Sequence, residues 1–208
     1  MTPAAWLALL PLRLMAALGL RRSLILACLF VLAVTAYGVA EDLGLLDPPA
    51  AAKPTRRASQ APPSAAARAD IPTSYLILYR RAASRCPGLS WAVLAAIGKV
   101  ESDHGRSRLP GVRSGWNTTG AAGPMQFGIG VGRAGNAWAR FGADFDGDGR
   151  RSVYDSGDAI PATARYLCAA GAPHRLDRAL YAYNHSWAYV AKVKAIAARY
   201  RNRGGDRR

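Results

Sequence analysis

The sequence has no convincing alternation of apolar and polar residues, so it predicts no strand. Residues 130–135 match the dinucleotide-binding pattern GxGxxG, but this segment follows no predicted strand and is interpreted as a loop. The three histidines are scattered and lack HExxH spacing, which argues against a zinc hydrolase. We therefore expect a helical protein without an organic cofactor.

Acidic residues are also few, since 13 Asp and Glu stand against 28 Lys and Arg, and the formal net charge is +15. Such an excess favours an anionic partner, for which nucleic acid, acidic lipid headgroups and cell-wall polymers are candidates. Much of the charge lies in the flanking segments, where a solvated basic surface is the ordinary interpretation. No recognition helix or aromatic-basic pattern is present, so nucleic acid is not expected as a partner.

Composition divides the chain into five segments. Residues 1–22 precede an apolar run, residues 23–40, which predicts either a membrane anchor or a cleaved signal segment. Two arginines just before the run keep 1–22 in the cytoplasm and place the remainder outside. Residues 41–70, rich in Pro and Ala, predict a disordered linker. A helical domain is expected over 71–200, followed by a basic tail, 201–208.

Helical periodicity and capping residues predict five helices in this domain: 73–85, 90–104, 155–169, 177–183 and 186–200. The Gly-rich region 105–142 is expected to be mostly irregular. Cys86 and Cys168 are the only cysteines of the domain. Because an extracytoplasmic location permits oxidation, a disulfide between them is expected, with two free buried thiols as the alternative.

Glu101 is the first candidate functional residue. Leu94, Ile97 and Gly98 precede it at helical spacing, so its carboxyl group lies on the apolar face near the end of the predicted helix. Burial and the negative end of the helix dipole both raise a carboxyl pKa. A glutamate protonated near neutral pH is what a general acid for glycosidic cleavage requires. The position alone favours a Glu that faces solvent or pairs with Arg106 or Arg108, and the neighbouring motifs reverse this preference.

Three short segments occur in order along the domain: KVESDHG around Glu101, GPMQF at 123–127 and AYN at 182–184. Together they resemble the signature segments of the goose-lysozyme-like lytic transglycosylases, enzymes that cut the glycan strands of peptidoglycan. The resemblance covers about 71–200 and implies a mainly α, lysozyme-like domain. Pro124 departs from the family, which often has another apolar residue there, so the backbone of this loop is expected to differ.

The resemblance also implies roles. Glu101 would act as acid and then as base on the bond between N-acetylmuramic acid and N-acetylglucosamine. Substrate-binding roles are implied for Ser102, Met125, Gln126, Phe127, Tyr183 and Asn184. Ser102 would orient Glu101 or contact the substrate, and Tyr183 and Asn184 would also hold the Glu101 carboxylate. Trp116, Phe127 and Trp187 are candidates for stacking on sugar rings, with core packing the alternative for Phe127.

The number of carboxylates bears on the mechanism. Most glycosidases use two, and the nearest second acid, Asp103, is two residues along the helix and points away from the face of Glu101. A single carboxylate suits attack by the C6 hydroxyl of the substrate, which the resemblance implies and which closes a 1,6-anhydro ring. A lysozyme-type hydrolase and an inactive wall-binding domain of the same fold are the alternatives.

The segment 144–155, DFDGDGRRSVYD, matches a twelve-residue EF-hand-like calcium loop. The predicted oxygen ligands come from Asp144, Asp146, Asp148, Arg150 (its carbonyl), Ser152 and Asp155. Since a single loop forms neither a paired sensor nor a dockerin, a structural Ca²⁺ site that braces the Gly-rich region is predicted, with a polar turn as the alternative. The loop and the following Asp158-Ala159-Ile160 resemble the membrane-bound lytic transglycosylase B type.

These observations predict a monomeric, extracytoplasmic lytic transglycosylase that acts on peptidoglycan. It would be attached to the cytoplasmic membrane by its N-terminal helix or secreted to the cell wall. Calcium is the only cofactor expected.

Overall fold

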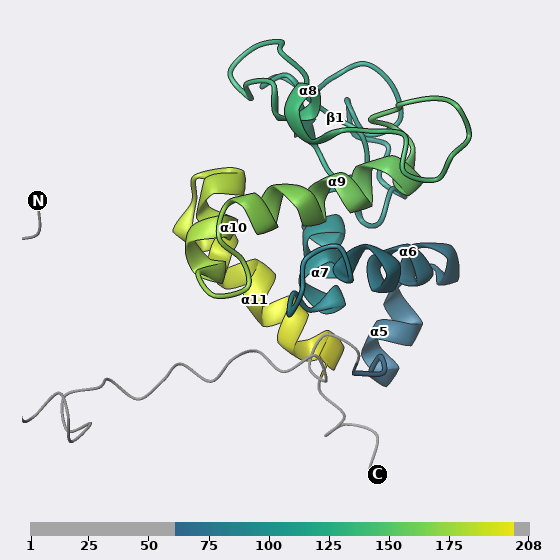
Figure 1. The fold of residues 1–208 in the computed structure, drawn as a ribbon, viewed down its shortest axis with the longest axis vertical. Coiled ribbons are helices and arrows are strands. Elements are labelled where there is room, and N and C mark those ends of the chain that lie inside the picture. The colour runs from purple at the N-terminus through teal and green to yellow at the C-terminus, as the bar shows by residue number, and fades with distance from the viewer. Residues whose placement is uncertain (1–60, 202–208) are drawn as a thin grey trace, which may run out of the picture. The chain divides into compact units, whose positions relative to one another are not determined.

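Residues 61–201 are described by a computed structural model of the chain, in which they form seven helices and one two-stranded hairpin (Figure 1). The mainly helical class is therefore confirmed. The predicted segments 1–22 and 23–40, most of the linker and nearly all of the basic tail lie outside the described residues. No helix within 61–201 has the length and apolar character needed to cross a membrane.

The elements follow one another along the chain. They are α5 Ala65–Asp70, α6 Thr73–Ala83, α7 Trp91–Ser102, β1 Ala121–Ala122, β2 Phe127–Gly128, α8 Ala137–Phe141, α9 Ser156–Ala169, α10 Leu176–Asn184 and α11 Trp187–Arg201. Five of them, α6, α7, α9, α10 and α11, correspond to the five predicted helices. Local capping explains where two begin: the Ser90 hydroxyl accepts from the Ala92 amide at 3.3 Å, and the Asp155 carboxylate accepts from the Gly157 amide at 2.6 Å.

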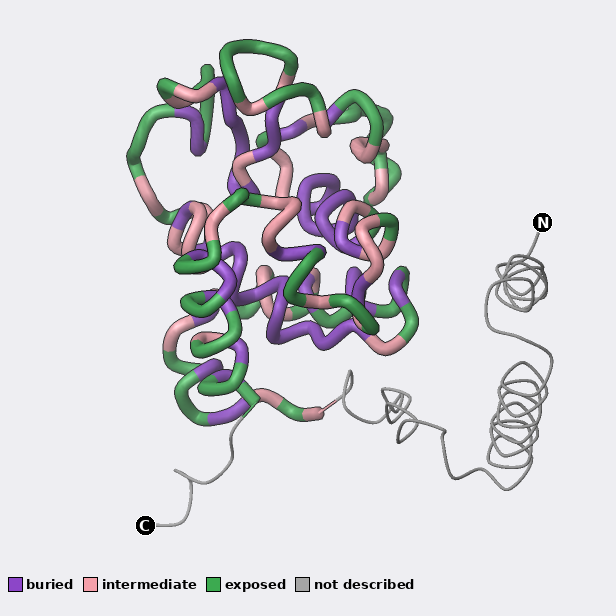
Figure 2. Tube along the Cα trace, turned by 90° about the vertical axis from the view of Figure 1, so that its left-hand side faces the viewer, coloured by how far each residue is buried: buried purple, intermediate pink, exposed green. Residues whose placement is uncertain are grey.

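Helix α7 is the centre of the fold. All of its residues from Trp91 to Gly98 are buried, as expected for a helix that is apolar on every side. It packs against α6 and α11, and α9 crosses over α6 (Figure 1). The outer helices are amphipathic. Along α11, which leads to the C-terminal trace in Figure 2, buried and exposed residues alternate within each turn. The buried helix α7 therefore carries Glu101 into the interior.

The folded unit begins before the predicted boundary at Ile71. Residues 61–70, assigned by composition to the linker, include α5, whose Ala67 is fully buried. The amide of Ser64 donates to the carbonyl of Tyr200 at 3.0 Å, and the Trp91 indole donates to the carbonyl of Ala61 at 2.7 Å. Alanine-rich sequence suits both a tether and a helix, so only these tertiary contacts distinguish the two.

The Gly-rich region contains more structure than predicted. Strands β1 and β2 pair antiparallel, with Ala121 opposite Gly128 and Ala122 opposite Phe127. Two residues per strand are too few for a period-two pattern, which is why the sequence shows no strand signal. The segment 130–135 is a loop, as predicted. The expected disulfide is also present: Cys86 after α6 is bonded to Cys168 near the end of α9, with Cα atoms 5.5 Å apart.

Candidate active site

A pocket of about 320 Å³ opens beside the end of α7. Its lining comes from the hairpin region, the loop that follows it, and helices α7, α8, α9 and α10. The lining residues are Glu101, Asn117, Thr119, Ala121, Gln126, Phe127, Gly128, Arg133, Ala134, Ala137, Tyr166, Ala182, Tyr183, Asn184 and His185. Five of the seven predicted catalytic and substrate-binding residues are among them, and the other two, Ser102 and Met125, are not.

The Glu101 carboxyl is only partly accessible and has one hydrogen-bond donor. The Tyr189 hydroxyl, from the first turn of α11, donates to Oε1 of Glu101 at 2.7 Å. Burial raises the pKa of Glu101 to about 7, and the hydrogen bond from Tyr189 and the charge of Lys192 lower it only in part. The expected elevation therefore arises chiefly from desolvation, and the group carries a proton for much of the time near neutral pH.

Tyr189 is a site residue that the sequence did not reveal. The expectation was that Tyr183 would hold the carboxylate, but the Tyr183 hydroxyl donates to the carbonyl of Met125 at 2.6 Å. The two tyrosine rings lie nearly parallel, with centroids 6.5 Å apart. Tyr183 thus joins α10 to the hairpin turn, and Tyr189 behind it reaches Glu101. The only local signal was the spacing of Tyr189, which lies four residues before the buried Val193 on α11.

Gln126 is held in the pocket wall by its neighbours. Its backbone is left-handed, with φ of 51°. The side-chain nitrogen Nε2 of Gln126 donates to the Gly123 carbonyl at 2.8 Å, and its side-chain oxygen Oε1 accepts from Nδ2 of Asn117 at 2.9 Å. The other end of the Asn117 side chain accepts from Thr119 and from the amide of Ala121. Asn117 is therefore the second missed residue, and it fixes the orientation of the predicted sugar-binding amide.

Ser102 and Met125 do not line the pocket. The buried Ser102 hydroxyl donates to the Pro124 carbonyl at 2.6 Å and accepts from the Gly105 amide at 2.8 Å. One residue is about 100° of helical rotation, which turns this side chain away from the face of Glu101. Met125 is fully buried in the core. Direct substrate contact by these two residues therefore stays a prediction, since in this structure both hold the GPMQF segment in place.

The aromatic candidates separate by exposure. Phe127 is buried and packs edge-on against Trp138. It lines the pocket, but most of its ring belongs to the hydrophobic core. Trp116 and Trp187 are 54% and 61% exposed. Trp187 follows the pocket-lining His185 by two residues, and its ring stacks on that of Tyr181 with centroids 4.6 Å apart.

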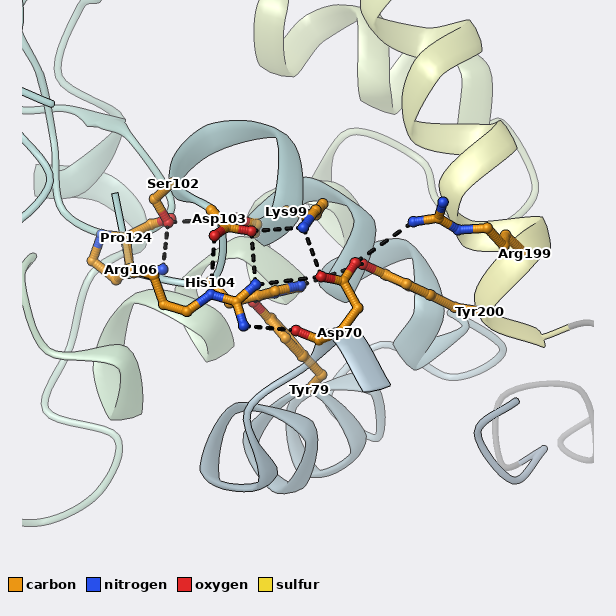
Figure 3. A network of polar contacts seen from close by, with 12 residues as sticks. Asp70, Tyr79, Lys99, Ser102, Asp103, His104, Arg106, Pro124, Arg199 and Tyr200 are labelled. Carbon is orange, nitrogen blue, oxygen red and sulfur yellow. Dashed lines mark hydrogen bonds and ion pairs between the residues drawn. The ribbon is translucent and has the colours of Figure 1, made fainter. Parts of the chain in front are cut away.

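A polar network fixes the other side of the end of α7 (Figure 3). Lys99 donates to Asp70 at 2.6 Å and to Asp103 at 2.7 Å, and Arg106 bridges the same two carboxylates. The Tyr200 hydroxyl donates to Asp70 at 2.6 Å. Arg106 and then Lys99 hold the pKa of Asp103 well below its usual range despite partial desolvation. Asp103 therefore belongs to this network, and Glu101 is the only acidic residue of the described chain that lines the pocket.

A buried histidine completes the network (Figure 3). His104 lies between the hydroxyls of Tyr79 at 3.0 Å and Tyr200 at 3.3 Å. Since Tyr200 donates to Asp70, its oxygen accepts from Nε2 of His104, and Nδ1 accepts from Tyr79. Burial lowers the pKa of His104 to about 4, so the ring is neutral. The end of α7 is thus anchored to α5, α6 and α11.

The predicted calcium loop, residues 144–155, and the start of α9 bring together a different set of carboxylates from the one predicted. Oxygens of Asp144, Asp146 and Asp158 lie within 4.8 Å of one another. Asp155, expected at the last ligand position, caps α9 at the Gly157 amide, and Asp148 accepts from the Arg150 amide at 2.8 Å.

Asp158 is fully buried, and its carboxylate accepts from the amides of Phe145 at 2.7 Å and Ser152 at 2.8 Å. It lies in the first turn of α9, so the helix start orients it toward the loop. Three like charges at this separation fit a hard divalent cation with oxygen ligands.

No protein-family model, curated protein or solved structure matches the chain. The chemistry of the site therefore rests on its own geometry. A carboxyl group that is partly protonated at neutral pH opens into a pocket rich in amide, hydroxyl and aromatic groups. Such a pocket is suited to a hydroxylated ligand and to transfer of a proton to one of its oxygens.

Proposed function

We propose that the chain is a lytic transglycosylase that cleaves the β-1,4 bond between N-acetylmuramic acid and N-acetylglucosamine in peptidoglycan. The observation that carries the proposal is Glu101, a lone buried carboxyl group whose pKa is raised to about 7 at the wall of a polar pocket. The order of the GPMQF and AYN segments around that pocket supports the same class of enzyme.

In the first step Glu101 donates its proton to the oxygen of the glycosidic bond as the bond from that oxygen to C1 breaks. Tyr189 then stabilises the carboxylate that forms, because its hydroxyl already donates to Oε1. In the second step the C6 hydroxyl oxygen of the same muramyl residue bonds to C1, and its proton passes to Glu101. The products are a free 4-hydroxyl and a 1,6-anhydro sugar, and the enzyme regains its starting protonation state.

The surroundings of Glu101 favour this route over hydrolysis. A second carboxylate usually activates water or attacks C1 in glycosidases. Asp103, the nearest acid in the sequence, is occupied by Lys99 and Arg106 on the other side of the helix end. An intramolecular hydroxyl needs no such partner, because the substrate itself holds the nucleophile close to C1.

Product analysis tests the reaction. The full-length chain and Glu101→Gln are incubated with peptidoglycan, and the soluble products are analysed by mass spectrometry. Anhydro-muropeptides released by the wild type alone are expected. Products with reducing ends would instead identify a lysozyme-type hydrolase, and the absence of any cleavage would leave an inactive wall-binding domain of the same fold.

A structural calcium ion is part of the proposal. Asp144, Asp146 and the buried Asp158 would hold it, and its charge would offset the repulsion among three carboxylates. The ion would join the start of α9 to the segment that follows α8. A higher melting temperature in Ca²⁺ than in chelator, and no such difference in Asp158→Asn, would support the site. Equal melting temperatures for the wild type would exclude it.

An extracytoplasmic location completes the proposal. The Cys86–Cys168 disulfide supports it, because such bonds persist mainly in oxidising compartments. Protease added to intact spheroplasts should degrade residues 61–201 if the domain is outside the membrane. Protection from the protease until the cells are lysed would contradict this location.

A further inference from the structure

The pocket contains one strong cation. Arg133 lies in the loop 130–135 and is the only Lys or Arg among the described residues that lines the pocket. Its exposed side chain makes no hydrogen bond, ion pair or ring contact with any other residue of 61–201. Arg140 and Arg151 differ from it, since they lie over the rings of Phe141 and Trp138. The donor capacity of the Arg133 guanidinium is therefore available to a ligand.

The backbone on both sides of Arg133 is held against the hairpin region. The Ala134 amide donates to the Thr119 carbonyl at 2.8 Å, and both residues line the pocket. On the other side, the carbonyl of Val131 approaches Gly120 so closely that a Cβ atom there would overlap it. Arg133 thus extends from a fixed position at the pocket wall.

Arg133 is not a partner of Glu101, the proposed acid. It forms no ion pair with Glu101 in the described part of the chain, and Tyr189 and Lys192 are the groups that moderate the raised pKa of Glu101. A cation paired with that carboxyl group would favour its ionised form and weaken the proton donor. The two ionisable side chains therefore act on different parts of a bound molecule.

We propose that Arg133 binds a carboxylate of the muramyl substituent and makes the site selective for glycan strands that carry this acid. The inference rests on the proposed function. The sugar rings and acetamido groups of the strand are neutral, so its negative charge comes from the lactyl side chain or from the peptide attached to it. A guanidinium group presents paired N–H donors that match the two oxygens of a carboxylate.

The test compares three substrates with the full-length chain: peptidoglycan with intact peptides, peptide-free strands with lactyl carboxylates, and the same strands after amidation of those carboxylates. The wild type should cleave the peptide-free acidic strands about tenfold faster than the amidated strands, the loss expected for one charge-assisted contact in a solvated pocket. Arg133→Gln should cleave both at the amidated rate. If its deficit appears only with intact peptides, the carboxylate belongs to the peptide.

Arg80→Gln is the matched control, because Arg80 is exposed on α6, away from the pocket, and its loss lowers the net charge equally. It should retain the wild-type preference for acidic strands. Equal losses in the two variants, or an Arg133→Gln variant that matches the wild type on all three substrates, would overturn the inference.

Binding measurements separate this inference from the proposed reaction. The same three strand preparations are titrated into Glu101→Gln and into Glu101→Gln combined with Arg133→Gln. Weaker binding of acidic strands by the double variant supports the carboxylate contact even if the wild type cleaves nothing, in which case only the proposed reaction fails. Equal binding by both variants would overturn the contact whatever the wild type cleaves.

Discussion

Glu101 and Asp103 lie two residues apart at the end of one helix, yet their carboxyl groups have opposite properties. Burial raises the pKa of Glu101 to about 7, with Tyr189 as its single hydrogen-bond donor. Asp103, whose side chain is 43% exposed, contacts Arg106 and Lys99, which hold its pKa well below the usual range. Two residues are about 200° of helical rotation, so one side chain enters the pocket and the other the ion network. Surroundings rather than residue type therefore separate a proton donor from a structural anion.

The largest effect expected from this comparison is on activity. Glu101→Gln removes the proton donor and should lower the initial rate of peptidoglycan cleavage by about a thousandfold, the usual contribution of a general acid. Asp103→Asn should retain most of the rate, because it alters only the network behind the pocket. Similar losses in both variants would show that the two carboxylates act together.

The same two positions should change stability in opposite directions. The folded-state pKa of Glu101 lies above its unfolded value of 4.5, so the stability it contributes is complete below that pH and is lost as the pH rises through about 7. Glu101→Gln should therefore unfold at higher denaturant concentration than the wild type at pH 8, by up to about 3 kcal/mol. If the free energies of unfolding of Glu101→Gln and the wild type differed by the same amount at pH 8 and pH 4, a buried, protonated Glu101 would be contradicted.

The pH profile of activity isolates the hydrogen bond to Glu101. The rate should fall as the pH rises through about 7, because the proton donor is then ionised. Tyr189→Phe removes a bond that favours the ionised carboxylate, so this fall should move to higher pH by about one unit. Tyr200→Phe removes a hydroxyl from the same helix that donates to Asp70 and not to Glu101, so it should leave the profile in place. A shift in both variants would assign the effect to α11 as a whole.

The smallest effect concerns Asp103. Its pKa is lowered in the folded state, so its contribution to stability is complete above the unfolded value of 3.8 and is lost progressively as the pH falls from there through the lowered folded-state pKa. Because the side chain is nearly half exposed, solvent weakens the ion pairs, and Asp103→Asn should cost only about 1 kcal/mol at pH 7. Urea unfolding at pH 7 and pH 2.5 measures this difference, which should be smaller at the lower pH.

Local patterns predicted much of the fold and part of the site. Ser90 and Asp155 cap the helices that they were expected to begin, and Glu101 lies on the predicted buried face. Gln126 and Asn184, two of the motif residues, also line the pocket. These predictions depend on a few neighbouring residues, whose spacing along a helix determines the direction of a side chain.

Other features were decided only by contacts between distant segments. The donor to Glu101 comes from Tyr189, 88 residues later, and the buried acid of the candidate metal site is Asp158 in place of Asp155. The helix formed by Ala65–Asp70 likewise depends on packing against the last turn of α11. The sequence by itself determined that Glu101 lies on an apolar helix face and which helix presents it. The tertiary structure decided its pKa and its partner, because desolvation and hydrogen bonding depend on which segments surround the carboxyl group.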